Sequence, residues 1–410
     1  MNRRDQKADP ARVAVFFGLF AALTAFPAVS GAQNGSTARP DWSRIRGVNY
    51  IPSYARSSSD MWQNYDADTV DRELGFVKGL GLNSVRVFLH FYPYEKNPAG
   101  ALAVFGDFLN RCRRHGLTVL PVFFDSCGLD PRPDAVEMSA ADAYAHFIQD
   151  PALPSQTRKR LEAVYREFAL GRGKAVRVPI GKTTPVDVFI WRWWSPSPGY
   201  ASLGREHWPA LERYVAAALA RGAGSPEIIA WEIMNEPGTL MDLPAGVCRQ
   251  EAESRLDGFL AHFSDFIRKR AGPVPMTIGA ENLDRMKRHE ALVELLSIHS
   301  YDEPAELKAE LEAATEWANQ KRKPLLITEC LANTRNWLTV FAEERLATDE
   351  GQLDHYRRIL PLLMDSGLGW YSWGFVSGQM FGTFTHIVHP DGYRRPAAMF
   401  LEETLRAAQR

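Results

Sequence analysis

The sequence contains few cysteines and almost no net charge. Its cysteines, Cys112, Cys127, Cys248 and Cys330, are too few and too widely spaced for a disulfide scaffold, and no pair has zinc-ligand spacing. Forty-eight basic and 49 acidic residues leave a formal net charge of -1 on 410 residues, so no global field favours nucleic acid. We therefore expect a neutral partner, with no nucleic acid and no metal or other cofactor.

The N-terminal segment differs from the rest of the chain. Basic residues come first, followed by the apolar run Val13–Val29 and the small residues Ser30-Gly31-Ala32. This order is typical of a secretory signal peptide over residues 1–32, and about 17 apolar residues are few for a membrane-spanning helix. We expect cleavage, a polar linker over 33–40, export to the periplasm or the extracellular space, and no stable membrane association.

From Asp41 onward, apolar segments alternate with amphipathic ones, as in βα units around a parallel sheet. Eight strands are expected, at Arg46–Tyr54, Asn83–His90, Leu117–Asp125, Ile228–Asn235, Val274–Ala280, Leu295–Tyr301, Pro324–Cys330 and Gly369–Phe375. Helices are expected between them, for example over Asp66–Gly81, His207–Gly222 and Gln352–Gly367. This count predicts an α/β fold, a (β/α)8 TIM barrel, over residues 41–410. A doubly wound open sheet is the alternative, but no Gly-rich phosphate-binding motif follows the first strand.

Polar residues at the carboxyl ends of barrel strands point into the mouth of the active site. The strand ends carry Arg86, Asp125, Asn235, Glu236, His299, Tyr301, Glu329 and Trp373. Two of these residues are glutamates, on strands four and seven. Paired carboxylates can divide the cleavage of a glycosidic bond, one protonating the leaving oxygen while the other attacks the sugar carbon.

The two glutamates need unlike surroundings for these roles. Arg86 and Tyr301 are natural donors to Glu329, which would keep it ionised and suited to be a nucleophile. Glu236 would be the acid, with Asn235 beside it to reach a substrate hydroxyl. By strand alternation, Glu232 shares a face with Glu236 but lies deeper in the barrel, where it needs an arginine or lysine partner.

Several motifs together resemble the cellulase-like glycoside hydrolase family 5 and its wider clan A. They are "RGVNY" on strand one, "NSVRVFL" on strand two, "WEIMNEPG" on strand four, "IHSYD" on strand six, "LLITEC" on strand seven and "GWYSWGF" on strand eight. The resemblance covers roughly Trp42 to Arg410, except for a long insertion after strand three.

The resemblance implies a role for each candidate residue. Glu236 would be the acid/base, Glu329 the nucleophile and Asn235 the partner of the sugar 2-hydroxyl. Arg86 and Tyr301 would orient Glu329, and the remaining matches, His299 and Trp373, would line the adjacent sugar subsite. The clan retains anomeric configuration, which implies a covalent glycosyl-enzyme intermediate. Where many members have a histidine after strand three, this chain has Asp125.

For four of these residues, a purely structural role stays open as an alternative to a role in catalysis or sugar binding. Arg86 could be a structural ion-pair partner in the barrel core, and Trp373 could be plain packing. Asp125 could bind sugar or cap the insertion. His299 could be a buried, hydrogen-bonded histidine without a role in binding.

The insertion, at about residues 126–205, is far longer than an ordinary βα connection. We expect it to have structure of its own, including a helix over Ser155–Phe168. Its aromatic segment Val188–Tyr200, which contains Trp191, Trp193 and Trp194, is either a stacking platform for sugar rings or a satellite core.

The sequence thus predicts a secreted retaining glycoside hydrolase that acts on an oligosaccharide or polysaccharide with β-linkages, of glucan, mannan or xylan type. A transglycosylase with the same site, a non-catalytic carbohydrate-binding barrel and a metal-dependent hydrolase are the alternatives. The second is disfavoured because Glu236, Glu329, Asn235 and Arg86 are all present. The third would need more His and Asp ligands at the strand ends than His299 and Asp125 supply.

Overall fold

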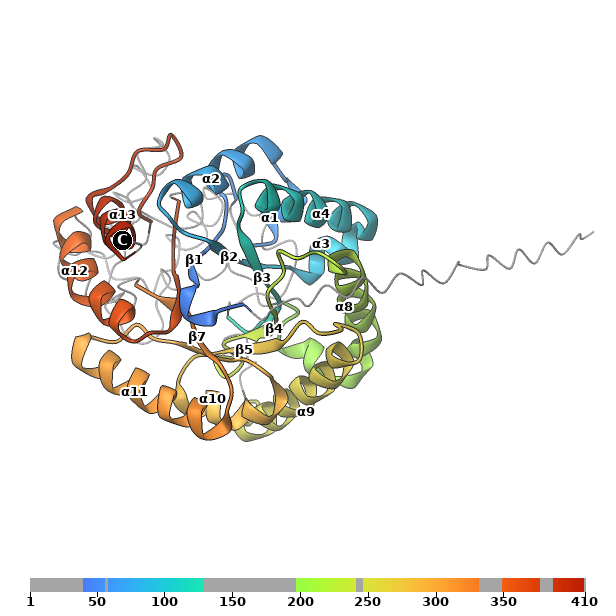
Figure 1. Cartoon of the computed structure of the whole chain (residues 1–410). Coiled ribbons are helices and arrows are strands. Elements are labelled where there is room, and N and C mark those ends of the chain that lie inside the picture. The colour runs from blue at the N-terminus through green and yellow to red at the C-terminus, as the bar shows by residue number, and fades with distance from the viewer. Residues whose placement is uncertain are drawn as a thin grey trace, which may run out of the picture. The chain divides into compact units, whose positions relative to one another are not determined.

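A computed structural model describes residues 40–55, 58–127, 197–240, 246–331, 349–376 and 386–408. Within these residues, eight parallel strands form a closed barrel in chain order, with β8 paired to β1. The strands are β1 Arg46–Asn49, β2 Ser84–Phe88, β3 Thr118–Asp125, β4 Trp231–Asn235, β5 Met276–Ala280, β6 Leu296–His299, β7 Leu325–Cys330 and β8 Gly369–Ser372. The strands lie at the centre of Figure 1, with helices around them. The predicted TIM barrel is confirmed.

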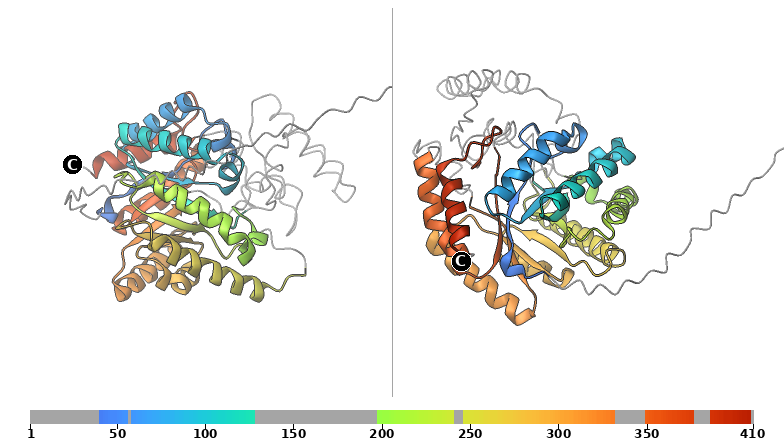
Figure 2. Two further views of the ribbon diagram at one scale, coloured as in Figure 1. Left: turned by 90° about the vertical axis from the view of Figure 1, so that its right-hand side faces the viewer. Right: turned by 45° about the horizontal axis from the view of Figure 1, so that its top comes forward.

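The helices cover the outside of the barrel, as the side and tilted views in Figure 2 show. They are α1 Asp60–Gln63, α2 Ala67–Gly79, α3 Phe91–Lys96, α4 Pro98–Arg114, α8 Trp208–Gly222, α9 Arg249–Arg268, α10 Leu283–His289, α11 Pro304–Lys321, α12 Asp349–Asp365 and α13 Pro396–Ala407. In α2, Val70, Leu74 and Val77 recur at helical spacing and are fully buried. Asp66 begins this helix by accepting hydrogen bonds from the backbone N–H groups of Asp68 and Thr69.

Most strand residues are apolar because both faces of the strands are covered, one by the barrel interior and one by the helices. In β2, β4 and β5 every residue is buried. A small apolar cluster that includes Ile45, Ile229 and Leu295, each just before a strand, lies at the amino ends of the strands. Polar side chains concentrate instead at the carboxyl ends, where the candidate site lies.

All eight predicted strands are present, and each is shorter than expected. The first ends at Asn49, while the prediction ran to Tyr54. Tyr50 and Ile51 are buried beyond the strand end, and the Tyr50 hydroxyl donates to Glu73 Oε2 at 2.9 Å. The buried, apolar stretch therefore extends past the end of β1, which explains why the sequence predicted a longer strand.

Several predictions concern residues outside the described ranges. These are the signal peptide, residues 33–39 of the linker, the helix at Ser155–Phe168, and the tryptophans at 191, 193 and 194. In the described part of the insertion, Tyr200 is buried, and Ser197 exchanges two backbone hydrogen bonds with Asp125 at 2.8 and 2.9 Å. No helix within the described ranges has the length and apolar character needed to span a membrane.

Candidate active site

Arg86, on β2, is the centre of the polar network in the barrel. Its side chain is fully excluded from solvent and donates five hydrogen bonds. Two of them, at 2.7 and 2.5 Å, go to the Glu232 carboxylate of β4, which is also fully buried. Arg86 is therefore the cationic partner that Glu232 was predicted to need. Arg86 is both a structural ion-pair partner in the barrel core and a member of the candidate site.

Glu329, at the end of β7, forms a second ion pair with the Arg86 guanidinium. Arg86 NH1 donates to Glu329 Oε1 at 2.6 Å, and the Tyr301 hydroxyl donates to Oε2 at 2.5 Å. These are the two donors that the sequence predicted. Both Glu329 oxygens thus accept bonds that favour the ionised form of this carboxyl group.

Glu236 follows β4 and forms no ion pair with a lysine or arginine of the described ranges. His299 Nδ1 lies 2.8 Å from Glu236 Oε1, and the Cys127 thiol donates to Oε2 at 2.9 Å. The same His299 nitrogen lies 3.5 Å from Glu329 Oε2, so the imidazole stands between the two glutamates. One ligand atom from each of Glu236, His299 and Glu329 lies within 4.8 Å of the others.

The electrostatics of the two carboxyl groups differ. Burial raises the pKa of Glu236, and the Cys127 hydrogen bond and the Arg86 charge oppose this rise. Burial also raises the pKa of Glu329, but His299, Arg86 and the Tyr301 hydrogen bond oppose it. Only Glu329 contacts the guanidinium directly, and this contact favours its ionised form. Burial lowers the pKa of His299 to about 4, so this ring is neutral at neutral pH.

The backbone at Glu236 has an unusual conformation for a residue other than glycine, with φ at 40°. The amide N–H of Glu236 donates to the Gly279 carbonyl oxygen at 2.8 Å. Its carbonyl oxygen accepts from the hydroxyls of Ser126 and, at 2.9 Å, Thr239. Such strain persists where surrounding contacts determine it, and it is common at functional sites.

The turn formed by Asp125, Ser126 and Cys127 supports both Asn235 and Glu236. Asp125 Oδ1 accepts from the Cys127 backbone N–H at 2.9 Å and from Asn235 Nδ2 at 3.0 Å. The Oδ1 atom of Asn235 in turn accepts from Arg86 at 2.7 Å. The two backbone hydrogen bonds with Ser197 link Asp125 to the end of the insertion. Sugar binding by Asp125 stays a prediction.

Trp373, one residue after β8, is largely buried, with 8% of its surface exposed. Its ring meets Phe88 edge to face, with centroids 6.2 Å apart. Phe88 also contacts the guanidinium of Arg86, which lies 4.8 Å from the ring centroid. The structure therefore brings Trp373 to the same end of the barrel as the other candidate residues.

Two residues of this network were not among the predicted site residues. Asn49, at the end of β1, accepts from Arg86 NH1 at 2.7 Å. The strand-end rule missed it because the predicted first strand ran on to Tyr54, five residues past the observed end. Cys127 could not be found in this way, because its contact with Glu236 depends on the turn after β3.

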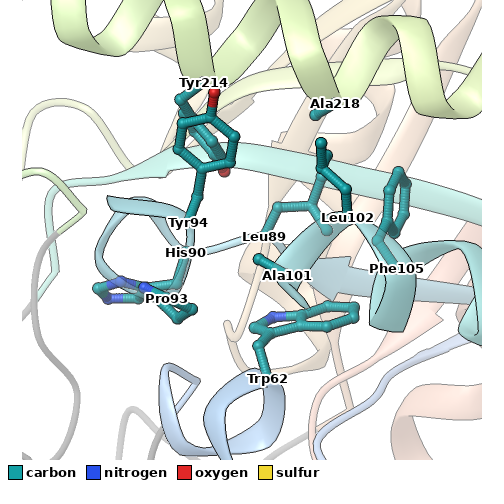
Figure 3. A pocket seen from close by; sticks show the side chains of 10 residues that line it. All are labelled: Trp62, Leu89, His90, Pro93, Tyr94, Ala101, Leu102, Phe105, Tyr214 and Ala218. Carbon is teal, nitrogen blue, oxygen red and sulfur yellow. The ribbon is translucent and has the colours of Figure 1, made fainter. Parts of the chain in front are cut away.

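A small apolar pocket lies away from this network, between the helices of the outer layer (Figure 3). Its lining includes Trp62, Phe105 and Tyr214, which come from α1, α4 and α8. No candidate site residue lines it. This pocket is therefore separate from the carboxylate pair.

Known structures share this fold at low sequence identity. Neither a scan against protein-family models nor a search of curated proteins finds a match. An exo-beta-1,4-mannosidase from Opitutaceae bacterium strain TAV5 is 17% identical, with a TM-score of 0.51 over 88% of this chain and 59% of that one. This chain therefore spans less than two thirds of that mannosidase.

Two further structures match over most of their own length. The endo-1,4-beta-D-mannanase from Thermotoga petrophila RKU-1 is 13% identical, with a TM-score of 0.51 over 89% of this chain and 99% of that one. The GH5_18 protein from Streptomyces cattleya, in complex with Manb1-4GlcNAc, is 15% identical, with a TM-score of 0.55 over 88% and 80%. The chain thus has the fold of the cellulase-like glycoside hydrolases of family 5 and clan A, as its motifs predicted.

Proposed function

We propose that this protein is a retaining β-glycosidase that uses two glutamates. The observation that carries the proposal is the pair Glu236 and Glu329, with one oxygen of each within 4.8 Å of the other. Retaining enzymes have carboxyl groups about 5 Å apart, whereas inverting enzymes leave roughly 6.5 Å or more for a water molecule. The short separation supports direct attack by one carboxylate on the sugar.

The contacts support a different role for each glutamate. Glu329, ionised beside Arg86 and Tyr301, attacks the anomeric carbon and forms a glycosyl ester. Glu236 gives its proton to the leaving oxygen and then, as a carboxylate, takes a proton from the water that cleaves the ester. Asn235 Nδ2 donates to Asp125 Oδ1 and also contacts the Cys127 sulfur at 3.7 Å, and its amide would exchange this weaker contact for the sugar 2-hydroxyl.

We further propose that the substrate is a β-linked glycan, and that β-1,4-mannosides are the first ones to test. The exo-mannosidase, the endo-mannanase and the Manb1-4GlcNAc complex among the structural neighbours support this order. Glucans and xylans belong on the same panel, because hydroxyl contacts in the loops discriminate between them. Product analysis on such a panel tests substrate class and endo or exo action together.

Variants of the two glutamates test the mechanism. We expect Glu329→Ala to abolish hydrolysis of aryl β-glycosides, with azide restoring part of the turnover. We expect Glu236→Ala to slow substrates with poor leaving groups most, because activated leaving groups need little protonation. Undiminished activity of Glu329→Ala, or an equal loss on both substrate types for Glu236→Ala, would count against these roles.

The same panel separates the alternatives. A transglycosylase would transfer the sugar to an added acceptor in preference to water, and a non-catalytic barrel would bind sugar without forming product. A metal ion at Glu236, His299 and Glu329 would lie against the Arg86 guanidinium, 2.6 Å from Glu329, which repels a cation. Metal-dependent hydrolysis is therefore the weakest of the alternatives.

Export is a separate proposal, which the order of residues 1–32 supports. We expect the protein recovered from the periplasm or the medium to begin at Gln33. N-terminal sequencing of the exported protein checks this, and a chain that stays in the cytoplasm with its N-terminus intact would contradict it.

A further inference from the structure

Cys127 is the only cysteine of the four that contacts a proposed catalytic carboxyl group in the described residues. Its thiol is 5% exposed and donates to Glu236 Oε2 at 2.9 Å. The Thr239 hydroxyl lies 3.5 Å from the same sulfur. The thiol thus has two neighbouring oxygens between which its hydrogen can rotate.

The turn that carries Cys127 is itself tied to the Glu236 segment. The Ser126 hydroxyl contacts both the Glu236 carbonyl oxygen and the Thr239 hydroxyl, the latter at 2.8 Å. The Cys127 backbone N–H is held by Asp125, whose carboxylate also accepts from Asn235. Side chain and backbone of Glu236 are therefore held by the same three-residue turn.

We propose that Cys127 is a positioning residue for the acid/base, which holds the Glu236 carboxyl group and favours its ionised form. This inference rests on the proposed function. When Glu236 is ionised, the S–H group donates to Oε2. When Glu236 carries its proton, the S–H group can turn to Thr239, so the thiol follows the proton state of the carboxyl group.

Burial raises the pKa of the Cys127 thiol, with added contributions from the charges of Glu236 and Asp125. The sulfur therefore stays protonated and remains a donor while Glu236 titrates. The other titratable or charged groups that face or act on Glu236 are His299 of β6, Glu329 of β7, Arg86 of β2, Tyr301 after β6 and Glu281 after β5. All of them are unchanged in the variants below.

Replacement of the thiol tests the proposal through the pH profile. Without the donor, Glu236 holds its proton more tightly, so Cys127→Ala should move the basic limb of kcat/KM to higher pH. At pH values where Glu236 is only partly ionised, the step in which it acts as a base should slow by about 3- to 10-fold, the usual worth of one hydrogen bond, because less of the carboxyl group is ionised. Cys127→Ser keeps a donor and should restore most of the profile. Cys112→Ala removes a buried thiol of α4 instead and should leave the profile unchanged.

A basic limb in Cys127→Ala that matches the unaltered protein, or a Cys127→Ser profile displaced as far as that of Cys127→Ala, would overturn the proposal. An infrared measurement decides it without any activity. The S–H stretching band that disappears in Cys127→Ala should shift as Glu236 titrates and should lose this pH dependence in Glu236→Gln. An S–H band that responds neither to pH nor to Glu236→Gln would overturn the proposal. Absence of glycosidase activity would contradict only the proposed function.

Discussion

Arg86 and Glu232 form a bidentate ion pair in which both side chains are fully excluded from solvent. Arg86 Nε donates to Glu232 Oε2 at 2.7 Å, and Arg86 NH2 donates to Oε1 at 2.5 Å. This pair lies below the two glutamates of the site and fixes the guanidinium that also holds Glu329. The geometry of the proposed nucleophile therefore depends on a carboxylate that touches no substrate.

The first prediction concerns this buried pair. Glu232→Ala should destabilise the protein by about 3–5 kcal/mol, because it leaves part of a buried guanidinium without its partner. Asp265→Ala, which removes an exposed partner of Lys269, should leave the free energy of unfolding nearly unchanged. Urea denaturation of both variants measures the difference, and equal effects would show that the pair adds no particular stability.

The second prediction concerns Gly279 of β5. A β-carbon at this position would collide with Glu232 and would lie 2.9 Å from His299 Nε2 and 3.0 Å from Arg86 NH2. Gly279→Ala should therefore disturb the network and reduce both stability and activity.

Gly258 provides the matched control, because a β-carbon there meets nothing within 4 Å. Gly258→Ala, in the middle of α9, should keep activity and gain up to about 1 kcal/mol of stability from helix propensity. Denaturation and turnover measured side by side decide the point. Full activity in Gly279→Ala would mean that the strand shifts easily and that the close packing is unimportant.

The third prediction concerns pH and stability. Burial raises the pKa of Glu236 above its ordinary 4.5. The folded state then binds the proton more tightly than the unfolded chain does, so this contribution to stability is present below pH 4.5 and is lost as the pH rises through the folded pKa.

Glu236→Gln removes this titration. The variant should gain stability over the unaltered protein as the pH rises from about 4 to 8, and the gain should vanish at the acid end. Thermal unfolding at several pH values measures it, with Glu312→Gln on the exposed surface of α11 as the control. A difference in Tm that does not change with pH would contradict the raised pKa.

The strands and most of the site follow from local patterns in the sequence. A parallel barrel buries both faces of its strands, so each strand reads as an apolar run, and a polar residue at its end marks the site. Arg86, Glu329 and Tyr301 were found in this way, and their mutual contacts agree with their predicted chemistry. Strand ends were less exact, since Tyr50 and Ile51 are buried although β1 ends at Asn49.

The contact between Cys127 and Glu236 could not be predicted from the sequence. Asp125 was noted as a departure from the usual histidine, but its effect on the chain depends on how its side chain holds the backbone two residues later. The positive φ of Glu236 likewise depends on tertiary contacts. The backbone of Glu236 bonds to Ser126 and Gly279, which lie far away in the sequence, and to the Thr239 hydroxyl. Such features depend on tertiary geometry.

The proposed mechanism requires Glu329 to form a covalent bond to the sugar. A 2-deoxy-2-fluoro β-glycoside with an activated leaving group, matched to the best substrate of the panel, slows breakdown of the glycosyl ester and lets it accumulate. Mass spectrometry of the digested protein should then find one fluorosugar on the peptide that contains Glu329, and none in Glu329→Gln. A protein that hydrolyses the parent glycoside but carries the label on another residue, or carries none, would contradict the account.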